Sequence, residues 1–441
     1  MYKNFLHLDF KGVVPAVEKL SEYLKYFKTC GFEGIIFEFD CRYQWQTWPD
    51  AAMPHLSKSD IQELIDCCQK LNLATIPLIQ IQGHLEWVLK HEHFAYLREN
   101  NFINEICPLH PESKKLIHKW IDEVLELFPE TEYIHLGADE TLNYASCPQC
   151  ADYASHSKHG KFGVYIDHVS ECCQYALSRG VRPIIWADMF WREKSSELAD
   201  ELPKGTILAD WQYTGSAPFD TTLELQKTNC EIWGASAISC AWYENRQSVQ
   251  REPGPRLENI LSWNKWGREN DSTVIHTTWG RPGNLWNLYP PWIGQLPFFI
   301  AAGNPEHWLQ HPWHDFFNEL NDYMFRNWPH ELEEVIKDLA KLPVANCWER
   351  ECLEWWNLAL RYQLLFKEYQ LFHIDRKCML ETQKFVGSDP ILFHKYFEEP
   401  KTNIPPKLDS WENDLKEFWE RNQLSDFAEF IAEKRAIFCF D

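Results

Sequence analysis

The sequence predicts an α/β protein, a (β/α)8 (TIM) barrel with a C-terminal α-helical extension. Three observations favour this fold: eight short apolar segments recur, helical segments separate them, and acidic or aromatic side chains follow most of them. Strands that alternate with helices form a parallel sheet, and eight such units close into a barrel. A doubly wound open sheet is the alternative, but no glycine-rich phosphate loop follows the first strand.

Short apolar runs mark the strands. The eight predicted strands are Phe5–Asp9, Gly34–Asp40, Ala74–Ile79, Tyr133–Gly137, Pro183–Ala187, Thr206–Trp211, Glu231–Ala235 and Val274–Thr278. The predicted helices are Pro15–Cys30, Ser57–Leu71, Glu112–Phe128, Gly163–Arg179, Thr221–Lys227, Leu257–Trp266 and Ile293–Ala302. In the second helix, Ile61 and Leu64 share one face, and Ser57 is placed to cap the N-terminus.

The pattern changes near residue 311, which predicts a catalytic barrel over residues 1–310 and a helical region over residues 311–441. Leu353 and Trp356 belong to an amphipathic helix, and the region contains no strand-like segment. Pro400–Pro406 is the most linker-like stretch. We expect this region to pack on the barrel or to form the contact of a homodimer.

Composition excludes several classes of partner. Acidic residues outnumber basic ones by 65 to 43, a formal net charge of −22, whereas nucleic acids and anionic membranes bind clustered Lys and Arg. No signal-like N-terminus is present, and no apolar run approaches the roughly 18 residues of a membrane span. The 15 cysteines are odd in number and scattered, unlike a disulfide framework. We therefore predict a cytoplasmic protein without nucleic-acid or membrane partners.

Carboxylates and large aromatic side chains stand at the predicted strand ends, where a (β/α)8 barrel places its active site. Trp faces can contact the apolar C–H patches of a pyranose, and charged side chains can bind its hydroxyls. The predicted substrate-binding residues are Glu38, Asp40, His84, Trp186, Trp211, Tyr213, Trp279 and Arg281. Trp233 is expected at the same rim, at the end of the seventh strand, and the Ala237–Pro255 loop is expected to set the pocket depth.

The adjacent carboxylates Asp139 and Glu140 follow the fourth strand. Adjacent carboxylates repel, so one of them can stay protonated near neutral pH. An isolated Asp-Glu pair is usually a solvated loop. At a strand mouth, the pair offers a proton donor and an anion within a few ångströms. We therefore interpret Asp139 and Glu140 as catalytic, with His84 orienting Asp139 or a neighbour.

The segment His135-Leu-Gly-Ala-Asp139-Glu140 resembles the His-x-Gly-x-Asp-Glu signature of family 20 glycoside hydrolases, the exo-β-N-acetylhexosaminidases. Three further segments resemble the hexosaminidase D branch of that family, in the same order along most of the first 300 residues. They are His7–Gly12, Ile76–Lys90 and Cys107–Ser113. The helical region adds little to the likeness.

The resemblance implies a retaining, substrate-assisted mechanism that acts on an N-acetylhexosamine-containing glycan or glycoside without a cofactor. Glu140 would be the general acid and then the base. Asp139 would orient the 2-acetamido group, whose carbonyl oxygen attacks to form an oxazolinium intermediate. Tyr213 matches the tyrosine that binds that carbonyl, and Trp186, Trp211 and Trp279 would surround the acetyl methyl group.

The chain departs from the commoner family pattern after its first strand. Many members hold the sugar 3- and 4-hydroxyls with an arginine there, whereas this strand ends in Asp9-Phe-Lys11. Glu38, Asp40 and Arg281 are the candidates for this role. The preference for GlcNAc or GalNAc stays open.

Two other functions fit parts of the pattern. A metal-dependent barrel hydrolase would use His7, Asp9, His84 and His135. A non-catalytic barrel would bind sugar only. Cys147-Pro-Gln-Cys150 has the spacing of a metal or redox site. Because no second C-x-x-C is present, we interpret it as a free-thiol loop and predict no metal ligands.

Overall fold

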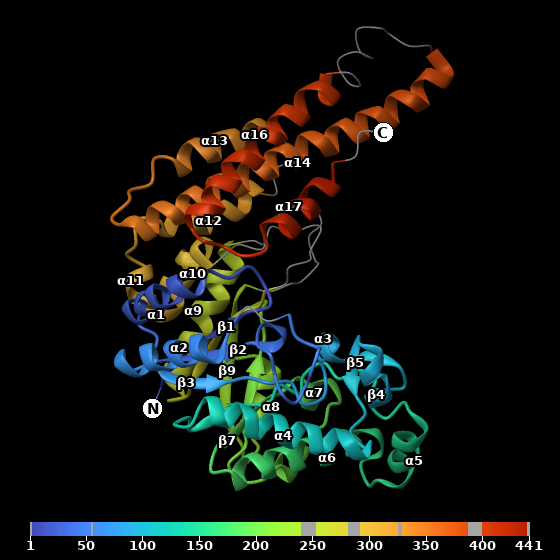
Figure 1. Ribbon diagram of the computed structural model, residues 1–441. Coiled ribbons are helices and arrows are strands. Elements are labelled where there is room, and N and C mark those ends of the chain that lie inside the picture. The colour runs from blue at the N-terminus through green and yellow to red at the C-terminus, as the bar shows by residue number, and fades with distance from the viewer. Residues whose placement is uncertain are drawn as a thin grey trace.

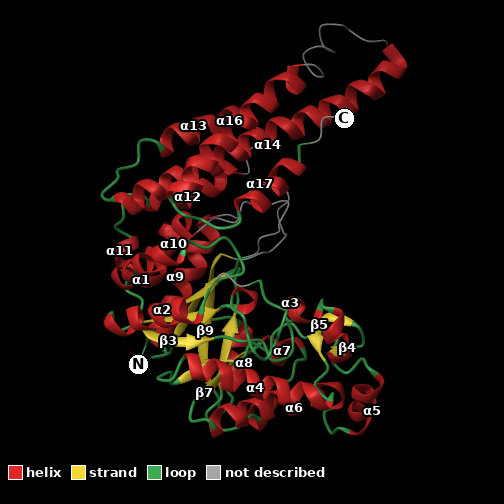
Figure 2. Cartoon of the chain, viewed as in Figure 1, coloured by secondary structure: helices red, strands yellow, loops and turns green. Residues whose placement is uncertain are grey.

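Eight parallel strands form the sheet at the centre of the molecule (Figures 1 and 2). The computed structural model describes residues 2–53, 56–239, 253–280, 292–324, 329–386 and 399–438. The sheet order is β3-β2-β1-β10-β9-β8-β7-β6. Its strands are β1 (Asn4–Asp9), β2 (Gly34–Glu38), β3 (Ala74–Pro77), β6 (Tyr133–His135), β7 (Arg182–Trp186), β8 (Ile207–Trp211), β9 (Glu231–Ser239) and β10 (Val274–Thr278). All eight predicted strands are therefore confirmed, with shifts of a few residues at their ends.

β3 and β6, the first and last strands in this order, lie side by side and close the barrel. Leu78, just after β3, forms a parallel bridge with His135 in β6. The Ile79 N–H donates to the His135 carbonyl at 2.9 Å, and the Ile81 N–H donates to the Leu136 carbonyl at 3.3 Å. The (β/α)8 barrel is confirmed, and the open doubly wound sheet is wrong.

Helices cover the outside of the barrel. They include α1 (Val17–Cys30), α2 (Lys58–Lys70), α4 (Pro111–Leu127), α6 (Gly160–Ser178), α8 (Asp220–Leu225), α9 (Pro253–Glu269) and α10 (Leu296–Gly303). Ser57 caps α2 as predicted, since its Oγ accepts from the Asp60 N–H at 3.2 Å and the Asp60 carboxylate accepts from the Ser57 N–H at 2.7 Å. Each long helix buries one apolar stripe against the strands.

Alternate residues of the strands fill the interior of the barrel, because successive side chains of a strand point to opposite faces. The interior cluster includes Phe5, Ile36, Ile76, Ile184, Ile207 and Ile275. The opposite faces of the strands pack against the helices. At the C-terminal end of each strand, the same alternation delivers the next inward side chain to the barrel mouth.

Trp233 lies at the opposite end of the barrel from the predicted site. It contacts Phe5 and Tyr133, with ring centroids 5.6 and 5.3 Å apart, near the starts of β1 and β6. The strand assignment explains the error, because β9 continues to Ser239 instead of ending near Ala235. Trp233 is therefore a core residue and not a rim residue.

A small insertion between β3 and β6 was not predicted. It contains α3 (Glu86–Leu89), the 3-10 helix η2 (Glu92–Leu97) and the antiparallel pair β4 (Arg98–Glu99) and β5 (Phe102–Ile106). These strands are too short to give an alternating pattern. In Figure 1 the β4–β5 hairpin lies near α5 (Pro148–His156), at the right-hand side of the barrel.

The C-terminal part is helical, as predicted. It comprises α11 (Pro305–Trp308), α12 (His314–Met324), α13 (Pro329–Leu339), α14 (Cys347–Val386), α16 (Glu399–Arg421) and α17 (Phe427–Ala436). Figure 1 shows α14 and α16 running side by side as an elongated layer above the barrel. The predicted linker Pro400–Pro406 is wrong, because these residues form the first turns of α16. Pro405 and Pro406 lie inside this helix, where each removes one intrahelical hydrogen bond.

The helical region packs directly on the barrel. The buried Trp356 indole N–H in α14 donates to the Gly294 carbonyl at 2.9 Å, within the 3-10 helix η4 (Trp292–Gln295). Near α17, the Arg42 guanidinium binds the Asp426 carboxylate at 2.8 Å. The boundary at residues 310 and 311 and a homodimer both stay predictions. No helix in the described ranges is long and apolar enough to cross a membrane.

The Trp356 contact predicts how strongly the helical region is attached. Trp356→Ala removes a fully buried ring and should lower the free energy of unfolding by about 3–5 kcal/mol. Trp356→Phe loses mainly the hydrogen bond and should cost about 1 kcal/mol. Urea unfolding followed by circular dichroism measures both changes.

Leu309→Ala is the matched control, since Leu309 is 56% exposed and should change stability by less than about 0.5 kcal/mol. Equal effects of Trp356→Ala and Leu309→Ala would contradict a packed junction between α14 and η4.

Candidate active site

An unusual backbone presents the Asp139-Glu140 pair at the mouth of β6. Gly137, Ala138 and Glu140 all have positive φ angles, of 62°, 69° and 49°. A Cβ atom on Gly137 would also collide with the end of the Gln80 side chain, so a larger residue there would force that buried amide to move. Non-glycine residues in this conformation cost roughly 1–3 kcal/mol each and cluster at functional sites. The chain turns sharply here and directs two adjacent carboxylates to the barrel mouth.

His84 lies between these two carboxylates. Its Nε2 atom is 3.2 Å from Asp139 Oδ2 and 3.5 Å from Glu140 Oε2. The preceding Gly83 allows this approach, because a Cβ there would stand 2.6 Å from the Asp139 carbonyl oxygen. Burial lowers the pKa of His84, but the attraction of Asp139 and hydrogen bonds to both carboxylates raise it well above its ordinary value. His84 is therefore a cation that bridges the pair.

Asp188 and Arg192 hold Glu140 from the other side. Asp188, at the start of α7 (Asp188–Arg192), accepts from the Glu140 N–H at 3.1 Å and from Arg192 Nε at 3.0 Å. An Arg192 amino group reaches the Glu140 carboxylate at 3.2 Å. Burial, and then the nearby Asp139 charge, raise the pKa of Asp188 to about 7. The sequence analysis did not select Arg192, although its i, i+4 spacing from Asp188 is a usable signal.

A second charged cluster surrounds Lys11 at the ends of β1 and β2. The Lys11 ammonium lies 3.0 Å from Asp9, 2.9 Å from Glu38 and 3.1 Å from Asp40. His7 Nε2 contacts the second Glu38 oxygen at 3.0 Å. All three carboxylate side chains are 1% exposed, whereas the Lys11 side chain is 13% exposed. Glu38 and Asp40, predicted to bind substrate, thus hold Lys11 at the mouth.

Two of the three carboxyls of this cluster, Glu38 and Asp40, have pKa values shifted in opposite directions. Burial raises the pKa of Glu38, but Lys11 and His7 outweigh it and leave that pKa well below its ordinary value. Burial also raises the pKa of Asp40, and the charges of Glu38 and Asp9 add to it, so that it reaches about 7 despite Lys11. One ammonium group does not neutralise three buried carboxylates.

Aromatic side chains form one wall of the mouth. The Trp279 indole N–H donates to the Tyr213 hydroxyl at 2.8 Å, and the Trp211 and Tyr213 rings are 5.1 Å apart. Trp186 is fully buried beneath them. Its ring centroid lies 5.9 Å from that of Trp279 and 4.3 Å from that of His135. The four aromatic residues predicted for the site therefore do come together. Trp186 lies at the base of the wall instead of on its surface.

Two predictions fall where nothing is described. Arg281 lies outside the described residues, as do residues 240–252 of the Ala237–Pro255 loop.

His135 lies inside the barrel. Burial lowers the pKa of His135 to about 3, so this imidazole stays neutral there.

Groups that could ligate a metal gather in two places within the described ranges. One contains His84, Asp139 and Glu140, and the other contains Glu99, Cys107, Cys147 and Cys150. His7, Asp9, His84 and His135, the ligands of the alternative metal hydrolase, do not form such a group among the described residues. The geometry therefore gives that alternative no support.

Comparison with known proteins agrees with this arrangement. A model of the glycosyl hydrolase family 20 catalytic domain matches residues 37–289, more than half of the chain. The chain belongs to glycosyl hydrolase family 20. By that membership it is a glycoside hydrolase, and the matched range includes the Asp139-Glu140 pair and His84.

The relatives of this family 20 member include two curated proteins named hexosaminidase D. The Bos taurus protein is 29% identical over 271 residues, which cover 59% of this chain and 78% of that protein. The Homo sapiens protein is 30% identical over 249 residues, 54% of this chain and 51% of that protein. The chain thus spans about half the length of the human relative, and the predicted likeness to the hexosaminidase D branch is confirmed.

A solved structure shares the fold. It is an exo-β-N-acetylglucosaminidase from Vibrio harveyi in complex with N-acetylglucosamine, with a TM-score of 0.51 and 15% identity. The match covers 73% of this chain and 57% of that chain. At this identity, the match supports the barrel fold alone.

The Lys11 cluster predicts a pH-dependent loss of stability in this family 20 enzyme. Lys11→Met leaves buried carboxylates without their cation and should lower the free energy of unfolding by about 3–5 kcal/mol at pH 8. The lowered pKa of Glu38 stabilises the fold above the ordinary carboxyl pKa, and Lys11 supplies that effect. In Lys11→Met the buried carboxyls take up protons as the pH falls. The loss in free energy of unfolding should therefore be smaller at pH 5 than at pH 8.

Thermal unfolding of both proteins at pH 5 and pH 8 measures this difference. Lys227→Met serves as a control, because the Lys227 side chain is 66% exposed. A deficit that is the same at both pH values would contradict the charge argument.

Proposed function

We propose that this chain is an exo-acting β-N-acetylhexosaminidase that hydrolyses terminal β-linked GlcNAc or GalNAc by a retaining, substrate-assisted mechanism. The observation that carries the proposal is the Asp139-Glu140 pair at the barrel mouth, with His84 between its carboxylates. Family membership and the names of the relatives support the same activity.

The two oxygens of Asp139 suit the role of orienting an amide. Oδ2 contacts His84 at 3.2 Å, whereas Oδ1 is buried and has no hydrogen-bond partner among the described residues. A buried acceptor without a donor is costly, and a substrate N–H can satisfy it. In the proposed mechanism, Asp139 Oδ1 accepts from the 2-acetamido N–H. Its charge then stabilises the oxazolinium that forms when the acetamido oxygen attacks the anomeric carbon.

Glu140 is the proposed acid and base. Its side chain is 37% exposed, against 10% for Asp139, so it is the more accessible carboxyl of the pair. The Asp188–Arg192 pair fixes its backbone and carboxylate from one side. Glu140 protonates the glycosidic oxygen as the bond to the leaving group breaks. It then takes a proton from the water that opens the oxazolinium.

The remaining predicted residues receive roles from their positions. The Tyr213 hydroxyl, oriented by Trp279, donates to the acetamido carbonyl, and Trp211 and Trp279 line the acetyl methyl group. Trp186 supports this wall from below. Lys11, held by Glu38 and Asp40, binds sugar hydroxyls. A cytoplasmic location and a homodimer also remain proposals.

Glu140→Gln tests the acid. With a β-GlcNAc substrate that has a poor leaving group, such as a second sugar, kcat/KM should fall by about 10²–10⁴-fold. A dinitrophenyl β-GlcNAc substrate should lose much less in glycosylation, because its leaving group needs no proton. Initial rates of both substrates measure the difference, and the exposed Glu112→Gln is the control. Full activity of Glu140→Gln on both substrates would contradict the assignment and favour a barrel whose acid lies elsewhere.

Asp139→Asn tests substrate assistance. Loss of the carboxylate should lower kcat and weaken inhibition by a thiazoline mimic of the oxazolinium, since the mimic and the intermediate need the same charge. Inhibition constants for the wild type and Asp139→Asn measure this, with the exposed Asp152→Asn as control. The wild type should hydrolyse p-nitrophenyl β-GlcNAc or β-GalNAc but not the β-glucoside. Equal rates on the glucoside would exclude an acetamido nucleophile.

A further inference from the structure

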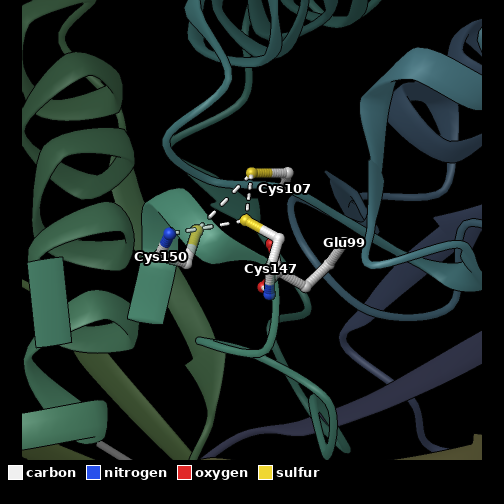
Figure 3. Close-up of side chains that lie close together, drawn as sticks. All are labelled: Glu99, Cys107, Cys147 and Cys150. Carbon is white, nitrogen blue, oxygen red and sulfur yellow. Dashed lines mark hydrogen bonds between the residues drawn. The ribbon is translucent and has the colours of Figure 1, made fainter. Parts of the chain in front are cut away.

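Three cysteines and a glutamate meet beside the loop that follows the proposed catalytic pair (Figure 3). Glu99 belongs to β4, and Cys107 directly follows β5. Cys147 caps the N-terminus of α5, and Cys150 lies in its first turn. One donor atom from each of the four lies within 4.8 Å of the others. Three separate segments therefore supply a four-atom cluster of ligand type.

The sulfur atoms have the spacing of a tetrahedral metal site. Cys107 Sγ lies 3.7 Å from Cys147 Sγ and 3.5 Å from Cys150 Sγ. Tetrahedral zinc with Zn–S bonds of about 2.3 Å holds its sulfur ligands about 3.8 Å apart. A disulfide requires a bond of about 2.05 Å. The Cys150 N–H also donates to Cys147 Sγ at 3.4 Å.

Glu99 supplies a second, independent observation. Its side chain is fully buried, and its Oε1 atom accepts from the Ser146 and Cys147 N–H groups, each at 2.7 Å. Among the residues that the structure describes, its Oε2 atom is buried without a hydrogen-bond partner of ordinary geometry, and the carboxylate faces the Cys107 thiol. Burying such an oxygen without a partner is costly, and a cation beside the three sulfurs would satisfy it. The backbone bonds aim this carboxylate at the cysteines.

We propose that Glu99, Cys107, Cys147 and Cys150 bind one structural Zn²⁺ ion. Thiolate ligands select zinc over magnesium or calcium, and a set of four protein ligands leaves no position for substrate or water. Binding displaces the thiol protons. Zinc binding at this site does not depend on the proposed sugar hydrolysis.

The ion would fasten the β4–β5 hairpin to the loop that leaves Glu140. Glu105 in β5 already holds this loop, since its carboxylate accepts from the Leu142 N–H at 2.9 Å and from the Asn143 N–H at 2.8 Å. Zinc would strengthen the second attachment, which Glu99 already makes to the Ser146 and Cys147 N–H groups a few residues further along. The pair of attachments would limit the motion of the chain that carries Glu140.

Metal analysis of the full-length wild type tests the site. Protein produced with added zinc and then dialysed should retain about one zinc per chain by mass spectrometry of the metal. Cys147→Ser and Cys150→Ser should each reduce this to no more than about a tenth. The matched controls are Cys67→Ser and Cys68→Ser, a partly buried and a buried thiol in α2, which should retain the metal.

Glu99→Gln separates a ligand from a structural acceptor. The amide oxygen can still accept from Ser146 and Cys147, so the fold should persist by circular dichroism while zinc affinity falls. Glu99→Cys, which offers a fourth thiolate, should restore zinc binding. Replacing zinc by Co²⁺ should give thiolate-to-cobalt charge-transfer bands in the wild type but not in the folded Cys150→Ser protein.

Three results would overturn the proposal. Folded wild type could contain no zinc and give no cobalt bands. The Cys147→Ser/Cys150→Ser protein could retain as much zinc as the wild type. The mass of the unreduced wild-type protein could show a disulfide within Cys107, Cys147 and Cys150 in place of free thiols.

Discussion

The junction between β3 and β6 is the constraint on which the candidate site depends. These strands are distant in sequence, and the barrel closes only when the backbone beyond β3 pairs with β6, from Ile79 to His135 and from Ile81 to Leu136. Beyond this pairing, the segments that follow β3 and β6 bring Gly83 against the Asp139 carbonyl. His84 then reaches both carboxylates of the pair. Loss of barrel closure would therefore separate the proposed catalytic residues from their cation, even if each strand stayed intact.

The insertion between β3 and β6 strengthens this junction from outside. Its hairpin carries Glu105, whose buried carboxylate binds the loop after the catalytic pair, and Glu99, whose carboxylate binds the same loop further on. The hairpin has too small a core to be stable alone, since isolated two-stranded hairpins are marginal in water. Buried hydrogen bonds to Glu99 and Glu105, with the proposed zinc ion, add to the apolar packing of Leu97 and Ile106 there. The same contacts fix both the hairpin and the path of the chain beyond Glu140.

Much of the barrel could be predicted from the sequence, because strand and helix periods are local properties. The strand ends therefore identified Asp139, Glu140 and the aromatic wall. Contacts between distant segments could not be predicted. Cys107 stands 40 residues before Cys147, so the cysteine pair appeared to lack further ligands until the fold supplied them. The role of Trp233 was wrong for a different reason, since one misjudged strand end moved it to the opposite end of the barrel.

The charges at the barrel mouth suit a reaction in which positive charge develops. Six carboxyl groups gather there with three cations among the described contacts. The carboxyls are Asp9, Glu38, Asp40, Asp139, Glu140 and Asp188, and the cations are Lys11, His84 and Arg192. Burial, together with the neighbouring carboxylates, raises the pKa of Asp40 and of Asp188 to about 7. A bound oxazolinium would offset part of this negative charge, whereas a neutral substrate would not. Because only interactions that strengthen towards the transition state accelerate a reaction, an excess of fixed carboxylates favours the cationic species over the substrate.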